Sequence, residues 1–267
     1  MTFAFQQAAS LADAAKAAAA HADAKLIAGG QSLLGAIKLG LAAPEALIDI
    51  SGLADLKGIK VEPGKVVIGA MTTHAAVAAS KEVQQAIPAL ADLAGRIGDR
   101  QVRNRGTLGG SLANNDPAAC YPAAVLGLGA TVHTDRRAIA ADDFFKGLYE
   151  TALQPGEIIT SVSFPVPEKA AWQKFKQPAS RFSIVGVFVA RTAGGVPGSV
   201  RVAVTGAGSC VFRATDIELA LAASWSAAAA QAVTVSDEGL NTDLHGSALY
   251  RAALIPVLAG RAVAAAG

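Results

Sequence analysis

The sequence Arg-Asn-Arg-Gly-Thr-Leu-Gly-Gly-Ser-Leu-Ala-Asn-Asn-Asp-Pro, at residues 103–117, constrains the fold more than any other stretch of the chain. Its concentration of glycine, hydroxyl and amide residues predicts a loop over residues 98–115. Glycine lets a ligand approach the backbone, and the hydroxyl groups of Thr107 and Ser111 can bind phosphate oxygens. Asn114 can bind sugar hydroxyl groups, and Asp116 can do the same or form a turn before Pro117. The alternative is a surface loop made of turn-forming residues.

A second glycine turn occurs earlier, where residues 28–32 have the sequence Ala-Gly-Gly-Gln-Ser. The apolar residues 25–28 predict a strand that ends at the glycines, and Ser32 is expected to cap a helix running to about Leu39. Free N–H groups at the beginning of a helix favour a diphosphate. One Gly-Gly turn is common between a strand and a helix. Two glycine segments in one chain suggest the two ends of a single dinucleotide, and we expect backbone N–H groups of both to converge on its diphosphate.

Other nucleotide and catalytic motifs are missing from the sequence. Neither segment is a P-loop or a GxGxxG fingerprint. Residues 202–209, Val-Ala-Val-Thr-Gly-Ala-Gly-Ser, are similar to the beginning of a short-chain dehydrogenase, but the residues after them are mostly helical in pattern. We therefore predict a strand that ends in a turn. His21, His74, His133 and His245 are scattered and expected to be exposed or hydrogen-bonded, so no catalytic residue and no metal site is predicted.

The composition excludes several classes of protein. Hydrophobic residues make up 52% of the 267 residues and charged residues 16%, as in a globular chain large enough for two modest domains. A net charge of +2 is too small to favour nucleic acid as a partner. The two cysteines, Cys120 and Cys210, cannot form a disulfide framework, which favours reduced thiols and a cytoplasmic location. No signal peptide and no membrane span is expected.

The periodicity predicts an α+β fold with a boundary near Pro165, after which the pattern changes to antiparallel strands. The predicted strands are residues 25–28, 47–50, 66–68, 130–133, 183–191 and 199–205. The predicted helices are residues 11–22, 32–39, 73–80, 88–97, 122–128, 215–223 and 248–265. A turn at residues 194–198 would join the last two strands into a hairpin.

Taken together, these motifs resemble the FAD-binding medium subunit of the molybdenum hydroxylases, the family of xanthine dehydrogenase and aerobic carbon monoxide dehydrogenase. The family's AGG-x-S sequence matches residues 28–32, and its T-[IVL]-GG-[NS] sequence matches residues 107–111. The flanking sequences Ile-Gly-Ala-Met-Thr-Thr at residues 68–73 and Leu-Gln-Pro-Gly-Glu-Ile-Ile at residues 153–159 agree as well. The resemblance covers almost the whole chain.

The resemblance implies a two-subdomain FAD-binding domain of the PCMH type at residues 1–165, with subdomains at about residues 1–55 and 56–165. A C-terminal α+β domain of the carbon monoxide dehydrogenase flavoprotein type would follow at residues 166–267, with an antiparallel sheet. It further implies non-covalent FAD on this chain, [2Fe–2S] clusters on a small partner subunit and the molybdenum cofactor on a large one. The complex would be a dimer of heterotrimers in which this chain passes electrons to an external acceptor. A stand-alone FAD oxidoreductase and a nucleotide-binding assembly module without redox activity are the alternatives.

The resemblance also implies which residues contact the cofactor. Lys176 would lie by the isoalloxazine ring and Phe182 beside it, although an exposed strand lysine and a core phenylalanine are the alternatives. Cys120 stands where relatives often carry a cofactor-binding aspartate, and Gln31 where some carry histidine. The complete predicted set is Leu26, Ile27, Ala28, Gly29, Gly30, Gln31, Ser32, Leu33, Leu34, Ala70, Ile97, Val102, Gly106, Thr107, Gly109, Gly110, Ser111, Asn114, Asp116, Cys120, Ile159, Lys176 and Phe182.

Overall fold

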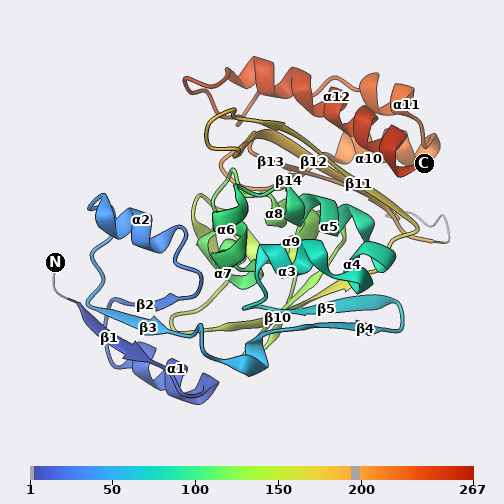
Figure 1. Ribbon diagram of the computed structural model, residues 1–267. Helices are drawn as coiled ribbons and strands as arrows, with labels where there is room; N and C mark the ends of the chain where they lie inside the picture. Colours follow the sequence, from blue (N-terminus) through green and yellow to red (C-terminus); the bar gives the residue numbers. More distant parts are fainter. Residues whose placement is uncertain (1–2, 194–198) are drawn as a thin grey trace.

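A computed structural model describes residues 3–193 and 199–267 of the protein. Its N-terminal part is a three-stranded parallel sheet in the order β1-β3-β2, formed by β1 (Ala4–Gln7), β2 (Ala24–Ile27) and β3 (Ala46–Asp49). Helix α1 (Leu11–Ala19) packs on this sheet through Ala14 and Ala17, and the Ser10 side chain caps it. Helix α2 (Leu33–Lys38) lies on the other side and buries no residue of its own (Figure 1).

The middle part contains a five-stranded antiparallel sheet in the order β4-β5-β10-β6-β7. Helices cover the face of this sheet that is turned toward the C-terminal part (Figure 1). The strands are β4 (Ile59–Glu62), β5 (Lys65–Gly69), β6 (Thr131–Thr134), β7 (Ala138–Ala140) and β10 (Ile159–Pro165). The helices are α3 (His74–Ala79), α4 (Lys81–Ala86), α5 (Pro88–Gly95), α6 (Arg100–Arg105), α7 (Leu108–Asn114), α8 (Tyr121–Gly127) and α9 (Ala141–Phe144), with a 3-10 turn at Ala54–Leu56. A small hairpin of β8 (Phe145–Gly147) and β9 (Glu150–Thr151) follows α9.

The predicted loop at residues 98–115 is wrong, because this stretch forms the two short helices α6 and α7. The side chains of the residues just before the two helices account for the difference. The Asp99 carboxylate accepts a hydrogen bond from the Val102 N–H at 2.8 Å, and the Thr107 hydroxyl accepts one from the Gly110 N–H at 3.1 Å. Such caps satisfy N–H groups that a helix leaves free, which lets a glycine-rich segment become helical.

The C-terminal part is a four-stranded antiparallel sheet of β11 (Lys169–Lys176), β12 (Ser183–Arg191), β13 (Val200–Thr205) and β14 (Phe212–Arg213). Helices α10 (Thr215–Ala223), α11 (Ala227–Gln231) and α12 (Ala248–Ala266) cover its outer face. Strand β13 ends before a turn, as predicted for residues 202–209. The predicted hairpin turn at residues 194–198 lies outside the described residues. Strands β10 and β11 were not predicted, because prolines surround them in the sequence.

Helix α12 is long and apolar enough to cross a membrane by length and composition, and half of its apolar window is buried. Ile255, Leu258 and Ala262 belong to the core that it shares with β12 and β13. Its buried Arg251 donates hydrogen bonds to the carbonyl oxygens of Ile184 at 2.6 Å and Gly206 at 2.9 Å. These contacts are those of a core helix in a folded domain.

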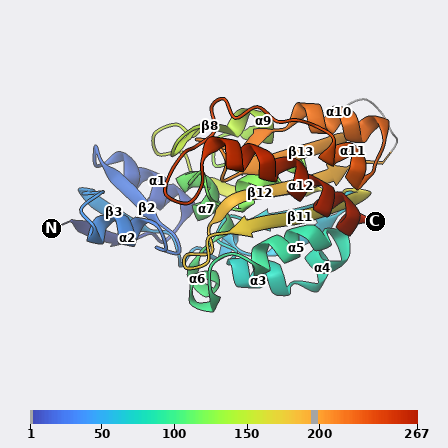
Figure 2. The same ribbon diagram turned by 90° about the horizontal axis from the view of Figure 1, so that it is seen from above.

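The middle helices lie between the two larger sheets (Figures 1 and 2). One core cluster joins Leu90 and Tyr121 of this layer to Phe164 of the five-stranded sheet and to Trp172 and Phe188 of the C-terminal sheet. The predicted boundary at Pro165 coincides with the end of β10. Because the two sheets share a core across the helices, the C-terminal part is held firmly over the middle part.

Candidate cofactor site

The two glycine segments, residues 28–32 and residues 106–111, lie in direct contact. A Cβ atom added to Gly29 would collide with the Arg105 carbonyl oxygen and lie 3.0 Å from the Cα of Gly106. A Cβ added to Gly110 would lie 3.6 Å from the Cβ of Ala28. Only glycine at position 29 permits this backbone approach. The two segments are therefore neighbours in the folded protein, as a shared dinucleotide requires.

The first glycine segment, residues 28–32, has free backbone donors. None of its five N–H groups donates a hydrogen bond to an acceptor in residues 3–193 or 199–267. Gly30 turns the chain with φ of 73°, a conformation that glycine adopts without strain. Leu26 and Ile27 end strand β2 just before the segment, and Gln31 and Ser32 are exposed. Consecutive open N–H groups in a turn form a binding site for an anion.

Ser32 does not cap α2, contrary to the sequence prediction. Its backbone already has helical dihedral angles, φ −104° and ψ −51°, and its side chain accepts no capping hydrogen bond. A residue acts as an N-cap only with an extended backbone. Leu33 is half-buried and Leu34 is exposed, so the first turn of α2 stays open beside the free N–H groups.

The second glycine segment, residues 106–111, uses the N–H groups of its helical residues for hydrogen bonds within the protein. The expectation that N–H groups of both segments converge on a diphosphate is therefore wrong for this segment. The four N–H groups at the beginning of α7 all have protein acceptors. Leu108 donates to Thr72 O at 3.1 Å, Gly109 to Ala70 O at 2.8 Å, Gly110 to Thr107 Oγ1 at 3.1 Å and Ser111 to Thr107 O at 3.0 Å. Buried backbone groups are paired in this way when the segment is part of the scaffold.

Two side chains of this region remain available to a ligand. Ser111 and Asn114 are half-buried on α7, and no hydrogen bond from either side chain is found within the described part of the chain. Thr107, in contrast, is buried and its hydroxyl oxygen serves as the cap of α7. The second glycine segment thus contributes the side chains of Ser111 and Asn114 to the site, together with close packing of its backbone.

Two of the recognised sequence motifs, residues 68–73 and 107–111, meet at Ala70 beside the residue that follows a third motif, residues 153–159. The Ala70 N–H donates to Thr160 O at 2.9 Å, and its carbonyl accepts from the Gly109 N–H at 2.8 Å. A Cβ at Gly109 would lie only 2.6 Å from the Ala70 Cβ. The side chain of Ile159, next to Thr160, is buried in the main core. The spacing of these motifs along the chain therefore reflects one continuous set of backbone contacts beside the site.

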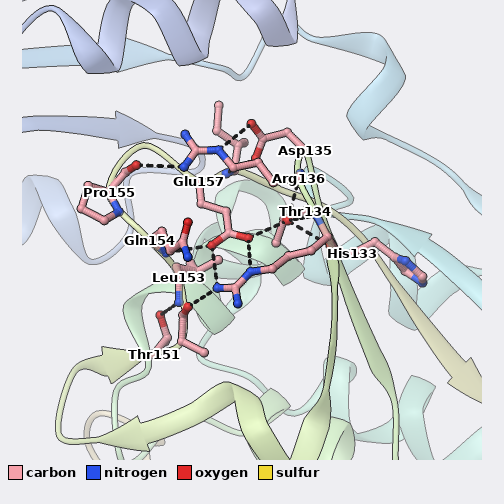
Figure 3. Close-up of polar contacts among 12 residues, drawn as sticks. His133, Thr134, Asp135, Arg136, Thr151, Leu153, Gln154, Pro155 and Glu157 are labelled. Carbon is pink, nitrogen blue, oxygen red and sulfur yellow. Dashed lines mark hydrogen bonds and ion pairs between the residues drawn. The ribbon is translucent and has the colours of Figure 1, made fainter.

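The glutamate of the motif at residues 153–159 has a structural role. Buried Glu157 accepts hydrogen bonds from Arg137 Nε at 2.9 Å, Arg137 Nη2 at 3.0 Å, Thr134 Oγ1 at 2.8 Å and the Gln154 N–H at 2.8 Å (Figure 3). The hydrogen bonds from Arg137, ahead of the other donors, lower the pKa of Glu157 to about 2. Next to it, Asp135 accepts from the Ile158 N–H at 2.7 Å. This network fixes the chain as it enters β10, two residues before Ile159.

The part of the site predicted to hold the isoalloxazine ring is called the ring end. It is built from the turn between α5 and α6, from α6 and from β11. Ile97 and Val102 are half-buried there, and Arg103 donates to the carbonyl oxygens of Ile97 at 2.9 Å and Gly98 at 3.0 Å. Phe182 is exposed, so the core-packing alternative for it is wrong. Lys176 is exposed at the end of β11, and its ammonium has no hydrogen bond or ion pair among the described residues.

Cys120 is buried, and its thiol faces protein groups. Its Sγ lies 3.4 Å from Lys174 Nζ and 3.7 Å from Ser183 Oγ. The same ammonium donates to Arg96 O at 2.8 Å and Arg181 O at 2.9 Å. Lys174 thus links β11 to Arg96, at the end of α5, and to Arg181, in the turn between β11 and β12. The sequence did not reveal this role.

Asp116 is the residue after Asn115 in the segment that follows α7. Its carboxylate accepts a hydrogen bond from the Ala118 N–H at 2.8 Å, and burial raises its pKa.

His74 is neither exposed nor fully hydrogen-bonded, contrary to the sequence prediction. It is buried, its Nδ1 has no partner among the described residues, and its ring lies 5.2 Å from that of Tyr121. Burial, followed by the charge of Arg103, lowers its pKa to about 4. A Cβ on Gly106 would lie 2.5 Å from His74 Nε2, which explains the glycine. No local signal in the sequence marks this contact between distant segments.

Comparison with known proteins gives consistent matches. The family model described as the FAD binding domain in molybdopterin dehydrogenase matches residues 1–167. The chain is 36% identical to the nicotine 6-hydroxylase medium subunit of Paenarthrobacter nicotinovorans, over 97% of this chain and 95% of that one. It is 35% identical to the carbon monoxide dehydrogenase medium chain of Hydrogenophaga pseudoflava, over 91% of this chain and 89% of that one.

Solved structures agree over the full length. The structure of the Hydrogenophaga pseudoflava carbon monoxide dehydrogenase that lacks the Mo-pyranopterin moiety superposes with a TM-score of 0.89 at 35% identity, covering 100% of this chain and 97% of that one. Quinoline 2-oxidoreductase from Pseudomonas putida 86 superposes with a TM-score of 0.88 at 30% identity and the same coverage.

Proposed function

This chain belongs to the FAD-binding medium subunits of the molybdenum hydroxylases, and from that premise we propose that it holds the FAD pyrophosphate on the first glycine segment, residues 28–32. It is a flavoprotein oxidoreductase subunit. One observation carries the proposal: residues 28–32 have five consecutive N–H groups without an acceptor in the described part of the chain, and this segment lies directly against the second glycine segment. A diphosphate supplies the anionic oxygens that such a row of donors lacks.

The second glycine segment completes the site through side chains. We assign Ser111 and Asn114 to hydroxyl and phosphate oxygens, because both side chains are accessible and lack protein partners among the described residues. Gly106, Gly109 and Gly110 bring the two segments together, and Ala70 anchors α7 beside them. These residues fix the distance between the diphosphate and the ring end.

At the ring end, we assign the side chains of Ile97, Val102 and Phe182 to packing around the isoalloxazine and the backbone of Ile159 to a contact with it. The exposed ammonium of Lys176 supplies positive charge at the edge of the ring. FAD, when bound, accepts single electrons and delivers them in pairs. The protein orients the ring and adjusts the local charge, and no residue of the site is needed to move a proton in substrate chemistry.

The partners follow from the family. The relatives are medium subunits or chains of multi-subunit enzymes, among them a nicotine 6-hydroxylase and a carbon monoxide dehydrogenase. We propose a small [2Fe–2S] subunit as the electron donor, a large subunit with the molybdenum cofactor as the site of substrate oxidation, and a dimer of heterotrimers in the cytoplasm. A stand-alone oxidoreductase would not co-purify with such chains.

The test begins with the absorption spectrum of the purified chain after incubation with FAD and gel filtration. A retained flavin spectrum with a stoichiometry near one supports the proposal, and an absent spectrum contradicts it. Reduction of the bound flavin by the substrate-treated complex, but not by substrate with this chain alone, separates an electron-transfer subunit from a stand-alone enzyme. Flavin that is bound but not reduced by the complex would indicate an assembly module.

A further inference from the structure

The β8–β9 hairpin carries a tyrosine in a strained backbone conformation. Gly147 pairs with Glu150, so Leu148 and Tyr149 form a two-residue turn, and Tyr149 has φ of 54°. Turn positions with positive φ favour glycine or asparagine, and a bulky residue there is unusual. Such strain persists where the surrounding structure enforces it, and it is frequent at ligand sites.

Tyr149 differs from the other strained residues of the described chain. Non-glycine residues with positive φ are Asn115, Tyr149 and Arg181. Asn115 ends α7, a position that asparagine suits, and Arg181 donates to Gly98 O at 3.0 Å. The Tyr149 side chain is 59% exposed and makes no hydrogen bond within residues 3–193 and 199–267. Asn115 and Arg181 therefore have contacts of their own that accompany their conformations. The conformation of Tyr149 is imposed by the turn, and its exposed side chain makes no hydrogen bond among the described residues that accounts for a tyrosine there.

The hairpin is clamped to the end of α7. Buried Asn115 donates from Nδ2 to Gly147 O at 2.9 Å and Glu150 O at 2.7 Å, gripping both ends of the two-residue turn. The clamp places Tyr149 beside Asp116: partial burial, and then the charge of Asp116, raise the pKa of the tyrosine. The tip of the hairpin is thus set over the segment that follows the second glycine segment.

That segment leads away from the diphosphate loop and toward the ring end. The first glycine segment contacts Arg105, Gly106 and Gly110, none of them beyond the first turn of α7, whereas Asn115 follows the last residue of this seven-residue helix, about 7 Å further along the axis than Gly110. On the far side, the N–H of Ser183 donates to Ala118 O at 3.3 Å, which brings the neighbouring Phe182 to the same segment. Tyr149 and Phe182 therefore flank residues 116–118 from two different elements.

We propose that Tyr149 is a ring-binding residue of the flavin site, which packs its exposed phenol ring on a planar conjugated ligand. The inference rests on the proposed FAD function, and the ligand is either the isoalloxazine or a planar electron acceptor next to it. A tyrosine offers a flat apolar face together with a polar edge, which suits either ring. The strained turn keeps this face presented before the ligand arrives.

The test compares Tyr149→Gly with Tyr149→Phe in the full-length, flavin-loaded protein. Glycine relieves the strain and removes the ring, so Tm should rise by about 2–4 °C. Phenylalanine keeps both the ring and the strain, so it should leave Tm and ligand binding close to wild type. If the ring packs on isoalloxazine, the glycine variant should bind FAD about 3- to 10-fold more weakly in a fluorescence titration.

If the ring packs on an acceptor instead, FAD affinity should stay unchanged. The KM for a water-soluble quinone or for NAD should then rise about 3- to 10-fold, while oxidation of the reduced flavin by oxygen keeps its rate. Unchanged FAD affinity together with unchanged acceptor kinetics in the glycine variant would overturn the inference, as would an equal loss in the phenylalanine variant. A wild-type chain that retains no FAD would overturn the proposed function itself, which is a distinguishable result.

Discussion

The two glycine segments are similar in sequence and different in use. In residues 28–32 the backbone donors have no acceptor among residues 3–193 and 199–267, one glycine turns the chain and the other lies against a neighbouring carbonyl. In residues 106–111 the donors at the beginning of α7 are all bonded within the protein, and the glycines make room for Ala70 and His74. The first segment offers hydrogen bonds to a ligand, while the second supports the first.

This contrast shows why glycine content alone does not identify a phosphate loop. Glycine permits both an open turn and close packing of two backbones. The neighbours decide between them: a threonine at position 107 caps the second segment into a helix, while Ser32 leaves the first uncapped. Substitutions in and around the two segments test this division, and the largest effect is expected at Gly29.

Gly29→Ala should separate the two segments. The added Cβ would collide with the Arg105 carbonyl, so we expect the free energy of unfolding to fall by about 2–3 kcal/mol. A displaced loop would lose at least two charge-assisted hydrogen bonds, which corresponds to about 100-fold weaker FAD binding. Urea unfolding and a flavin fluorescence titration measure the two effects.

Gly35→Ala is the matched control, because no atom lies within 4 Å of its added Cβ in the nearby helix α2. Alanine should stabilise that helix by about 0.5–1 kcal/mol and leave FAD affinity unchanged. Equal losses in both variants would show that the contact between the segments is not what matters.

Glu157→Gln should reduce the stability of the protein more than its FAD affinity, because Glu157 supports the chain beside the second glycine segment and not the first. The amide loses the ion pair with Arg137 and leaves buried polar groups poorly matched, so we expect stability to fall by about 2–3 kcal/mol at pH 7, with FAD affinity reduced by less than about threefold. A larger loss of affinity than of stability would contradict the division of roles.

The contribution of the Glu157–Arg137 ion pair to stability depends on pH, and the pKa of Glu157 determines the direction. The folded-state pKa of Glu157, about 2, lies below the ordinary glutamate value of 4.5, so its contribution to stability is complete above about pH 5. That contribution is lost as the pH falls toward 2. The difference in unfolding free energy between wild type and Glu157→Gln should therefore shrink steadily between pH 5 and pH 2 in denaturant titrations.

Thr107→Ala should affect stability and Ser111→Ala should affect FAD binding, although both residues carry hydroxyl groups of the same segment. Loss of the Thr107 cap should cost about 1 kcal/mol of stability, with little direct effect on the ligand. Loss of the Ser111 hydroxyl should leave stability within about 0.5 kcal/mol and weaken FAD binding by about 2- to 10-fold. The opposite pattern would place the ligand on the capping residue.

Lys176→Met should give the smallest effect. Removal of an exposed charge close to the ring changes its electrostatic energy by about 1 kcal/mol, which lowers the two-electron reduction potential by about 20 mV. FAD affinity should stay close to wild type. Lys174→Met is the contrasting variant: because its ammonium binds two carbonyl groups, it should cost stability as well. An unchanged potential in Lys176→Met would place this lysine away from the ring.

Sequence patterns were sufficient for the elements with local signals. Ser10 and Thr73 cap their helices, α10 has its predicted ends, and β12 pairs with β13 as predicted from two apolar runs close together in the sequence. Motif spacing was sufficient to bring the glycine segments together. Strands β10 and β11 were missed because prolines between them resemble a loop, whereas their pairing with β5 and β12 depends on distant residues.

The remaining part of the site depends on contacts that local sequence does not encode. Whether the Gly109 N–H is free or bonded is decided by the carbonyl of Ala70, 39 residues earlier. The burial of His74 beneath Gly106, the Lys174–Cys120 contact and the Asn115 clamp arise in the same way from separate elements. A prediction from local pattern has no access to these long-range partners.

The division between the two segments is tested most directly by amide hydrogen exchange of the flavin-free and FAD-loaded protein, followed at single residues. We predict that the N–H groups of residues 28–32 exchange rapidly without FAD and become strongly protected when it binds, while those of residues 108–111 are protected in both states. Protection gained only at residues 108–111, with residues 28–32 unchanged, would contradict the account.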